Sequence, residues 1–307
     1  MKSIRIHGFN TPAVINEVSV PSIEADQVLV RVMASALNPL DIGLMAGWAA
    51  RFFPIEFPYA IGCDFAGVVE RVGDAVTTFK PGNAVVAWAD PLTGGGLSEY
   101  SAVPAKSCVL LPSSLTPIEG AAIPTAGSTA WHGLFSEGHI KPGETVLVHA
   151  ASGGVGIFAV RFAKKAGARV LATTSGAGID LVRSLGADEV VDYKKQDFAQ
   201  VFRDVDLVLD LVGGETQSRS YPVLKRGGRL VSTTSPPDVA VASAHGVSAT
   251  MMYVKPYASR LDEVVRAVAQ DGFKVVLDTS VPFEAFNDAI ERQRSGRARG
   301  KIIITQS

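Results

Sequence analysis

The spacing of apolar residues divides the chain into two kinds of region. Residues 1 to about 118 carry short apolar runs separated by Gly, Pro and Asn, a pattern typical of β-strands joined by turns. We expect strands at Val14–Val20, Val28–Val32, Ala66–Val72, Ala84–Trp88 and Ser98–Val103. This region is therefore predicted to be all-β and barrel-like.

From Pro117 onward, apolar runs alternate with helical patterns. The expected strands are Thr145–His149, Arg169–Thr173, Leu207–Leu211, Arg229–Thr233 and Val247–Tyr253. Nearly continuous apolar strands separated by helices indicate a parallel sheet that is covered on both faces. The fold class is α/β, with a doubly wound parallel sheet beside the β-barrel region.

The last part of the chain resembles the first region more than the sheet. It carries a helix at Leu261–Gln270, a short strand at Val275–Leu277, a helix at Phe283–Arg294 and a final strand at Lys301–Thr305. We expect the chain to leave a β domain, form a second domain and then return. The predicted domains are residues 1–118 with 257–307, and residues 119–256.

A glycine loop lies between the first apolar strand of the sheet region and the helix that follows it. It runs through Ala151, Ser152, Gly153, Gly154, Val155 and Gly156. Glycine lets a pyrophosphate approach the backbone, where the N–H groups and the dipole of the helix face its charge. Ala151 replaces the first glycine of G-x-G-x-x-G, so an ordinary tight turn is the alternative.

The end of the next strand bears on the choice of cofactor. A site for NAD places an acidic residue there, about twenty residues beyond the loop, to bind the ribose 2′-hydroxyl. This chain has Thr174, Ser175 and Gly176 instead. Hydroxyl and backbone donors suit a 2′-phosphate, so NADP(H) is expected, although these residues also suit a plain turn.

Composition narrows the class of protein. The chain has 307 residues, 47% of them apolar, which is enough for two packed domains. Its net charge is −1 without an extended basic run, so nucleic acid is not an expected partner. Two cysteines exclude a disulfide framework. Without a leader pattern or a long apolar segment, the expected location is cytoplasmic, with no membrane contact.

Seven motifs occur together and in order along the whole length. They are Asn38-Pro39-Leu40-Asp41, Ile61 to Val69, Val72-Gly73, Gly82 to Val85, Ala150 to Gly156, Leu185 to Asp188 and Gly227 to Leu230. With them the chain resembles the zinc-independent quinone oxidoreductases of the medium-chain dehydrogenase/reductase superfamily, and within these the enone oxidoreductase group.

The resemblance implies an architecture. It comprises a GroES-like catalytic domain, a Rossmann domain, a cofactor in the cleft between them and a homodimer joined through the edge strand at Val247–Val254. Zinc-dependent members hold their metal with Cys, His and Cys, and the corresponding residues here are Asn38, Cys63 and Thr125. A catalytic zinc normally needs three good protein ligands, so no zinc is expected.

Without a metal, hydrogen bonds must stabilise the charge that develops on a carbonyl oxygen. Quinones and α,β-unsaturated carbonyls spread this charge by conjugation, so they are the expected hydride acceptors. The alternatives are reduction of another small carbonyl, or a structural or regulatory protein that binds NADPH with little turnover.

The candidate substrate-side residues are Asn38 and Asp41, which stand at a turn after an apolar strand. Asn before Pro also starts turns for local reasons, and Asp41 also suits a helix cap. Aromatic side chains are expected to line an apolar pocket or else to pack in a core. They are Trp48, Phe53, Trp88 and Tyr253.

The remaining candidates concern the cofactor. The resemblance implies that Thr129 contacts the nicotinamide end and that Tyr193 flanks the 2′-phosphate, where relatives often carry a Lys in place of Gly178. Val212, Gly213, Ser232 and Thr233 follow adjacent strands on the cofactor side. Lys301 is expected either to bring a positive charge to the pyrophosphate or to lie on the surface at the start of a strand.

Overall fold

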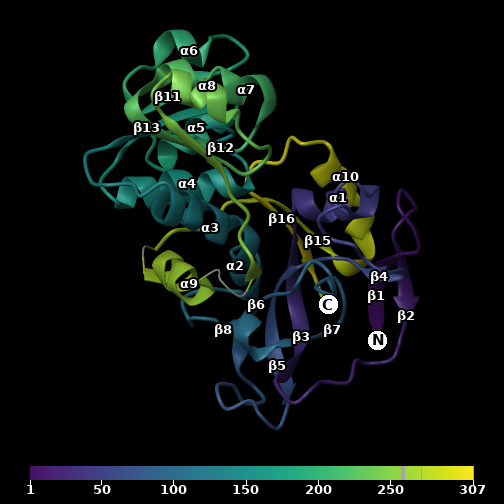
Figure 1. Ribbon diagram of the computed structural model, residues 1–307. Helices are drawn as coiled ribbons and strands as arrows, with labels where there is room; N and C mark the ends of the chain where they lie inside the picture. The colour runs from purple at the N-terminus through teal and green to yellow at the C-terminus, as the bar shows by residue number, and fades with distance from the viewer. Residues whose placement is uncertain (257–259, 271, 307) are drawn as a thin grey trace. The chain divides into compact units, whose positions relative to one another are not determined.

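The computed structural model describes residues 1–256, 260–270 and 272–306 (Figure 1). The chain forms two compact units. The first, here called the β unit, comprises Met1–Thr125 and Lys255–Ser307, and the second, the parallel-sheet unit, comprises Ala126–Val254. The divisions after Thr125 and Val254 lie a few residues from the expected positions 118 and 256.

Over its described residues, the β unit holds two sheets and four α-helices. Its strands are β1 (Lys2–Ile6), β2 (Val14–Glu17), β3 (Gln27–Leu37), β4 (Tyr59–Ala60), β5 (Asp64–Val72), β6 (Ala84–Trp88), β7 (Tyr100–Pro104), β8 (Cys108–Leu110), β15 (Leu277–Pro282) and β16 (Lys301–Thr305). Its helices are α1 (Pro39–Ala46), α2 (Pro117–Ala121), α9 (Leu261–Gln270) and α10 (Phe286–Arg294).

Strand β3 is the centre of the larger sheet. The order is β15-β16-β3-β5-β6-β8, and β7 also pairs with β3. The C-terminal strand β16 runs antiparallel to the end of β3, with Ile302 opposite Leu37. Because β5 pairs with the same end of β3, placing Asp64 opposite Ala36, three distant segments meet beside Asn38.

The parallel-sheet unit has six strands in the order β11-β10-β9-β12-β13-β14. Every neighbouring pair is parallel. This order of parallel strands is that of a Rossmann fold. The strands are β9 (Thr145–Val148), β10 (Arg169–Thr174), β11 (Glu189–Asp192), β12 (Val205–Asp210), β13 (Leu224–Ser232) and β14 (Ser248–Met251).

Helices connect these strands. They are α4 (Gly154–Lys165), α5 (Gly178–Ser184), α6 (Phe198–Val201), α7 (Gly214–Ser218) and α8 (Val239–Ala244), and α3 (Pro124–Trp131) leads into the unit (Figure 1). Val146, Leu147 and Val148 of β9 are fully buried, as the apolar run predicts for a strand at the centre of a parallel sheet. Within the described part of the chain, none of the helices combines the length and apolar character needed to cross a membrane.

The C-terminal segment differs from the expectation in one place. Helix α9 spans Leu261–Gln270 as predicted, with Leu261, Val264, Val265 and Val268 buried on one face. The strand expected at Val275–Leu277 instead begins at Leu277 and continues to Pro282. Apolar content favoured Val275, but pairing with β16 determines the strand and recruits the polar residues Asp278, Thr279 and Ser280.

Candidate functional site

Asn38 stands between the end of β3 and the start of α1. Its backbone is extended, and Pro39 begins the helix, where the missing N–H of proline has no cost. The Asn38 backbone N–H donates to Oδ2 of Asp41 at 2.7 Å. Asp41 is therefore the residue that orients the turn at Asn38, and both side chains are buried.

A buried polar network surrounds the Asn38 amide. Its Nδ2 donates to Oδ2 of Asp64 at 3.0 Å, and its Oδ1 accepts from Nζ of Lys301 at 2.5 Å. The same Nζ donates to the Leu37 carbonyl oxygen at 3.0 Å and lies 3.9 Å from Oδ2 of Asp64. Thr125 donates to Asp64 through its hydroxyl at 2.6 Å and through its backbone N–H at 3.1 Å.

Burial determines the electrostatics of this network. It raises the pKa of Asp41 to about 7, an effect that the backbone N–H of Asn38 opposes and the nearby Asp64 reinforces. Burial also raises the pKa of Asp64 and lowers that of Lys301, while their mutual attraction opposes both shifts. All the groups hydrogen-bonded to Asp64 are donors, so we treat it as the carboxylate paired with the Lys301 ammonium.

The position of Lys301 corrects an expectation from the sequence. Lys301 does begin a strand, but its side chain is only 3% exposed, so it is not a surface lysine. Its hydrogen-bonding partners belong to the Asn38 turn. The structure thus places this positive charge in the buried network around Asn38.

The glycine loop of the parallel-sheet unit has the geometry of an anion site. Helix α4 begins after Gly153, and no side chain caps its first N–H groups. A Cβ at Gly156 would lie 2.5 Å from the Ala150 carbonyl oxygen, so only glycine allows this close turn. Ser152, Gly154 and Val155 are half-buried around the same turn, whereas Ala151 is buried beneath it. The uncapped first turn of α4 suits a pyrophosphate.

The loop after β12 is held by Asp210. Its Oδ1 accepts from the backbone N–H groups of Val212 at 3.0 Å and Gly213 at 2.8 Å. Its Oδ2 accepts from Gln217 at 3.0 Å and from Ser232 at 3.0 Å. Val212, Gly213, Ser232 and Thr233 therefore lie together at the carboxyl ends of β12 and β13, the edge where open α/β sheets bind ligands.

A cluster of hydroxyl groups lies at the end of β10. Ser152 and Thr174 are hydrogen-bonded at 2.7 Å, and Ser175 donates to the hydroxyl of Tyr193 at 3.3 Å. A Cβ at Gly178 would lie 2.4 Å from Oγ1 of Thr174 and 2.9 Å from Oγ of Ser152. A side chain at Gly178 would therefore have to displace this hydroxyl pair.

His149 serves the sheet itself. Its two ring nitrogens lie 2.9 Å from the hydroxyls of Thr173 and Ser220. Burial lowers its pKa to about 4, which the nearby Asp210 opposes, so the ring is neutral at physiological pH. His149 is thus a satisfied core histidine.

The four aromatic candidates have different surroundings. Trp48 and Tyr253 are exposed, Phe53 packs against the core around α1 and α10, and Trp88 is buried in the β unit. Thr129 is half-buried in α3 of the parallel-sheet unit. The roles of these residues remain predictions from the sequence.

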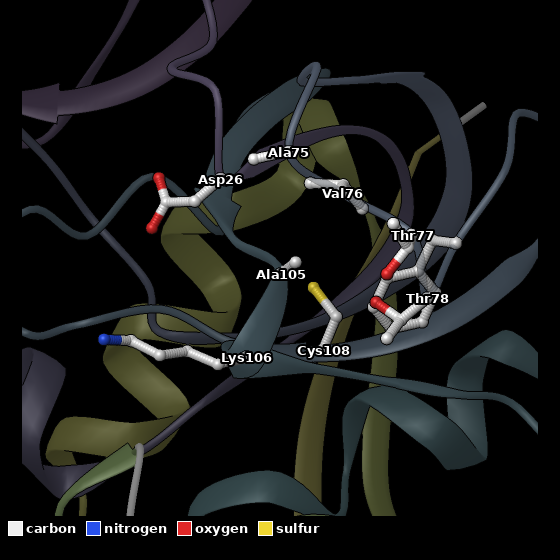
Figure 2. A pocket seen from close by; sticks show the side chains of 9 residues that line it. Asp26, Ala75, Val76, Thr77, Thr78, Ala105, Lys106 and Cys108 are labelled. Atoms are coloured by element: carbon white, nitrogen blue, oxygen red, sulfur yellow. The ribbon is translucent and has the colours of Figure 1, made fainter.

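A separate cavity of about 440 Å³ lies in the β unit (Figure 2). Its lining includes Asp26, Val76, Thr78, Lys106 and Cys108. Asp26 directly precedes β3 and Asn38 directly follows it, and eleven strand residues span about 36 Å. This cavity therefore lies at the opposite end of β3 from the Asn38 network.

Sequence reasoning undervalued three residues of these sites. Asp64 lay only inside the Ile61 to Val69 motif and, like Asp210, had no assigned role. Lys301 was left between the pyrophosphate and the surface. An acidic residue at the end of an apolar strand was the available signal for Asp210. For Lys301 the partner is 263 residues away, so the local sequence held no comparable signal.

Comparison with known proteins supports the same organisation. Residues 24–113 match the family model described as alcohol dehydrogenase GroES-like domain, and residues 185–304 match the model described as zinc-binding dehydrogenase. The chain is 35% identical over 303 residues to a chloroplastic quinone-oxidoreductase homolog of Spinacia oleracea, covering 94% of this chain and 92% of that protein.

Two further comparisons reach most of this chain. A 2-methylene-furan-3-one reductase of Solanum lycopersicum is 36% identical over 305 residues, covering 94% of this chain and 74% of that protein. A mycobacterial structure complexed with NADPH is 26% identical, with a TM-score of 0.90 and 99% coverage of both chains. The GroES-like and Rossmann folds are thereby confirmed, and the chain belongs to the quinone oxidoreductase family of the medium-chain dehydrogenase/reductase superfamily.

Proposed function

We propose that this protein is an NADPH-dependent oxidoreductase that transfers hydride to a quinone or an α,β-unsaturated carbonyl. The observation that carries the proposal is the uncapped, glycine-cradled start of α4 in a chain that aligns over 94% of its length with a quinone-oxidoreductase homolog. The reductase from tomato and the NADPH-complexed neighbour support the acceptor class and the cofactor.

The residues of the parallel-sheet unit fit NADPH. The first turn of α4 would hold the pyrophosphate, and the loop fixed by Asp210 would line the same sheet edge. Ser175 and Tyr193 offer hydroxyls to a 2′-phosphate. When bound, NADPH supplies the hydride, which carries two electrons to the conjugated acceptor.

Asn38 is the proposed donor to the acceptor carbonyl. As hydride adds to the conjugated system, negative charge moves to that oxygen and forms an enolate or a hydroquinone anion. An N–H of Asn38 stabilises this charge, and a proton from water then completes the saturated carbonyl or the hydroquinone. Among the described residues, one amide N–H of Asn38 is assigned to Asp64, and the second is the one offered to substrate.

We also propose that the reaction is zinc-independent. Asn38 and Thr125 are poor zinc ligands, and both are committed to Asp64. Burial and nearby carboxylates raise the pKa of the Cys63 thiol well above its ordinary value, which disfavours the thiolate that binds metal. Within the described residues, His, Cys, Asp and Glu do not gather in a group of three that would hold a metal ion.

The assembly and location remain proposals from the sequence. Strand β14 (Ser248–Met251) is the last strand of the six-stranded order and pairs with β13, which supports a homodimer through this edge. Light scattering on the purified protein would measure the mass, and a monomer at micromolar concentration would reject the dimer. Cytoplasmic location and the lack of a nucleic-acid partner are likewise predictions.

The decisive test is steady-state oxidation of NADPH and NADH with quinones, short enones and saturated aldehydes, with and without a chelator. We expect chelator-resistant turnover of conjugated acceptors with NADPH. Asn38→Ala should lower kcat by about 10²-fold, because an oxyanion donor is lost, while the Kd for NADPH stays within twofold. Activity that depends on added zinc, or tight NADPH binding without turnover, would reject the proposal.

A further inference from the structure

The ammonium group of Lys301 is directed inward from the first residue of the C-terminal strand. It donates to the Leu37 carbonyl oxygen and to Oδ1 of Asn38, and Asp64 lies 3.9 Å away. Two acceptors and one carboxylate thus surround the ammonium, and the side chain is only 3% exposed. Lys301 is therefore poorly placed to contact substrate itself, and any effect on the reaction must pass through a neighbour.

The chemistry of its two charged neighbours determines how the Asn38 amide is oriented. A lysine ammonium has only donors, so it must face the amide oxygen, and a carboxylate has only acceptors, so it must face the amide nitrogen. A flipped amide would bring NH₂ against the ammonium of Lys301 and oxygen against the carboxylate of Asp64. Asn38 is thus held in one of its two orientations by charges of opposite sign.

Burying a charged network is not an efficient way to stabilise the β unit. A buried charge pair loses its hydration, and apolar residues of similar volume are often as stabilising or more so. Yet Lys301, Asp64 and Asn38 are each at most 3% exposed, and each hydrogen-bonds another residue at the Asn38 turn. The position of the charges relative to the amide is what an apolar replacement would not reproduce.

We propose that Lys301 is a positioning residue that orients the Asn38 amide and strengthens its remaining N–H as a hydrogen-bond donor. A cation that binds the amide oxygen draws electron density from the nitrogen, so the N–H becomes a better donor to a developing oxyanion. This inference rests on the proposed function of Asn38. It adds that the ammonium of Lys301 supports the transition state through one intervening amide.

The first test is Lys301→Met, which keeps an unbranched side chain only one atom shorter and removes its charge. We expect kcat with an enone or a quinone to fall by 10- to 100-fold, while the Kd for NADPH stays within twofold. The matched control is Lys2→Met, in the same unit, because the Lys2 ammonium is exposed and forms an ion pair with Glu284. That variant should keep wild-type kinetics.

A binding measurement separates positioning from a structural effect. With NADP⁺ present and in mildly alkaline buffer, 4-nitrophenol is ionised and carries an oxyanion, whereas its methyl ether, 4-nitroanisole, has the same ring without the charge. We expect Lys301→Met to weaken binding of the phenolate at least tenfold and that of the ether less than twofold. Equal weakening of both ligands would indicate a damaged pocket and overturn the proposal.

The double variant Asn38→Ala/Lys301→Met tests whether Lys301 acts through Asn38. We expect its kcat to match that of Asn38→Ala alone within about threefold, because the route from the cation to the substrate is already broken. Multiplied losses would overturn the proposal.

Two results separate this inference from the proposed function. If Asn38→Ala is impaired but Lys301→Met turns over normally, only the role of Lys301 fails. If wild type reduces no conjugated acceptor, the proposed function fails, and unequal binding of phenolate and ether still decides the effect of the charge. If Lys301→Met does not fold, Lys301→Met/Asp64→Asn removes both charges, and the same phenolate selectivity should be lost.

Discussion

Two buried polar networks, one around Asn38 in the β unit and one around Asp210 in the parallel-sheet unit, are stabilised in opposite ways. In the β unit, Lys301 is buried beside the two carboxyl groups of Asp41 and Asp64. In the parallel-sheet unit, the donors to Asp210 among the described residues are neutral, and His149 is uncharged. The first arrangement concentrates charge near a proposed reaction centre, and the second holds a loop without a countercharge. The β unit should therefore lose stability when a buried charge loses its opposite charge. The parallel-sheet unit should lose stability when hydrogen-bond donors lose their acceptor.

Removing one carboxylate from each unit should give the largest difference between the units in lost free energy of unfolding. Asp64→Ala leaves the Lys301 ammonium buried without its opposite charge, which costs about 3–5 kcal/mol. Asp210→Ala leaves neutral donors unpaired and should cost about 1–3 kcal/mol. Urea unfolding followed by hydrogen exchange of peptides from each unit would measure both losses.

Asp64→Asn is the control for shape, since its amide still accepts one of the hydrogen bonds from Thr125. We expect Asp64→Asn to lose less free energy of unfolding than Asp64→Ala and more than Asp210→Ala. If Asp64→Ala costs no more than Asp210→Ala, Lys301 does not depend on Asp64 for its charge, and the contrast between the units fails.

A change of pH should alter the stability of the two units in opposite directions. Asp41 keeps its proton up to a pKa of about 7 in the fold but only to 3.8 when unfolded. The unfolded state thus gains from deprotonation first, and the β unit should lose stability as pH rises from about 4 to about 7. His149 has a pKa of about 4 in the fold and 6.5 when unfolded, so the parallel-sheet unit should lose stability as pH falls from about 6.5 to about 4.

Hydrogen exchange across this range, compared with Asp41→Asn and His149→Gln, isolates each contribution. We expect Asp41→Asn to reduce the change with pH in the opening free energy of β3 and α1 by a few kcal/mol. His149→Gln should reduce the corresponding change in β9 and β10. Each variant should leave the other unit unchanged. The same slope in both units would show that the two networks are not electrostatically distinct.

The smallest effect concerns the cofactor. Ser175→Asp places a negative charge beside the hydroxyl of Tyr193, where the 2′-phosphate is proposed to bind. The ratio of kcat/KM for NADPH to that for NADH should fall about tenfold or more, equivalent to about 1.4 kcal/mol. Ser175→Ala should lower it less, because it removes a donor without adding repulsion, and an unchanged ratio in both variants would reassign the 2′-phosphate.

Features with local signals could be predicted from the sequence. The glycine loop follows an apolar strand and precedes a helical pattern, so β9 and α4 were expected where they occur. Helix α9 was expected with its observed bounds because its buried residues repeat at helical spacing. Asn38 drew attention because a polar residue before proline closes an apolar strand.

Features that depend on distant pairing could not be predicted in the same way. The register of β16 against β3 brings Lys301 to Asn38, and nothing in the sequence around Lys301 encodes that register. Strand β15 begins later than its apolar residues suggest, because its partner β16 determines its position. In both cases the deciding contact is made by another part of the chain.

The pairing of β16 with β3 has a consequence for biosynthesis. A ribosome that has released residues 1–256 has supplied Asn38, Asp64 and the whole parallel sheet, but it has not yet made the strand that carries Lys301. Until that strand docks, Asp64 lacks the ammonium of Lys301, and the Asn38 amide lacks the hydrogen bond to its oxygen. The parallel-sheet unit is contiguous and can fold during synthesis. Because Lys301 is proposed to orient Asn38, full activity should appear only once β16 has docked, instead of growing with the length of chain already made.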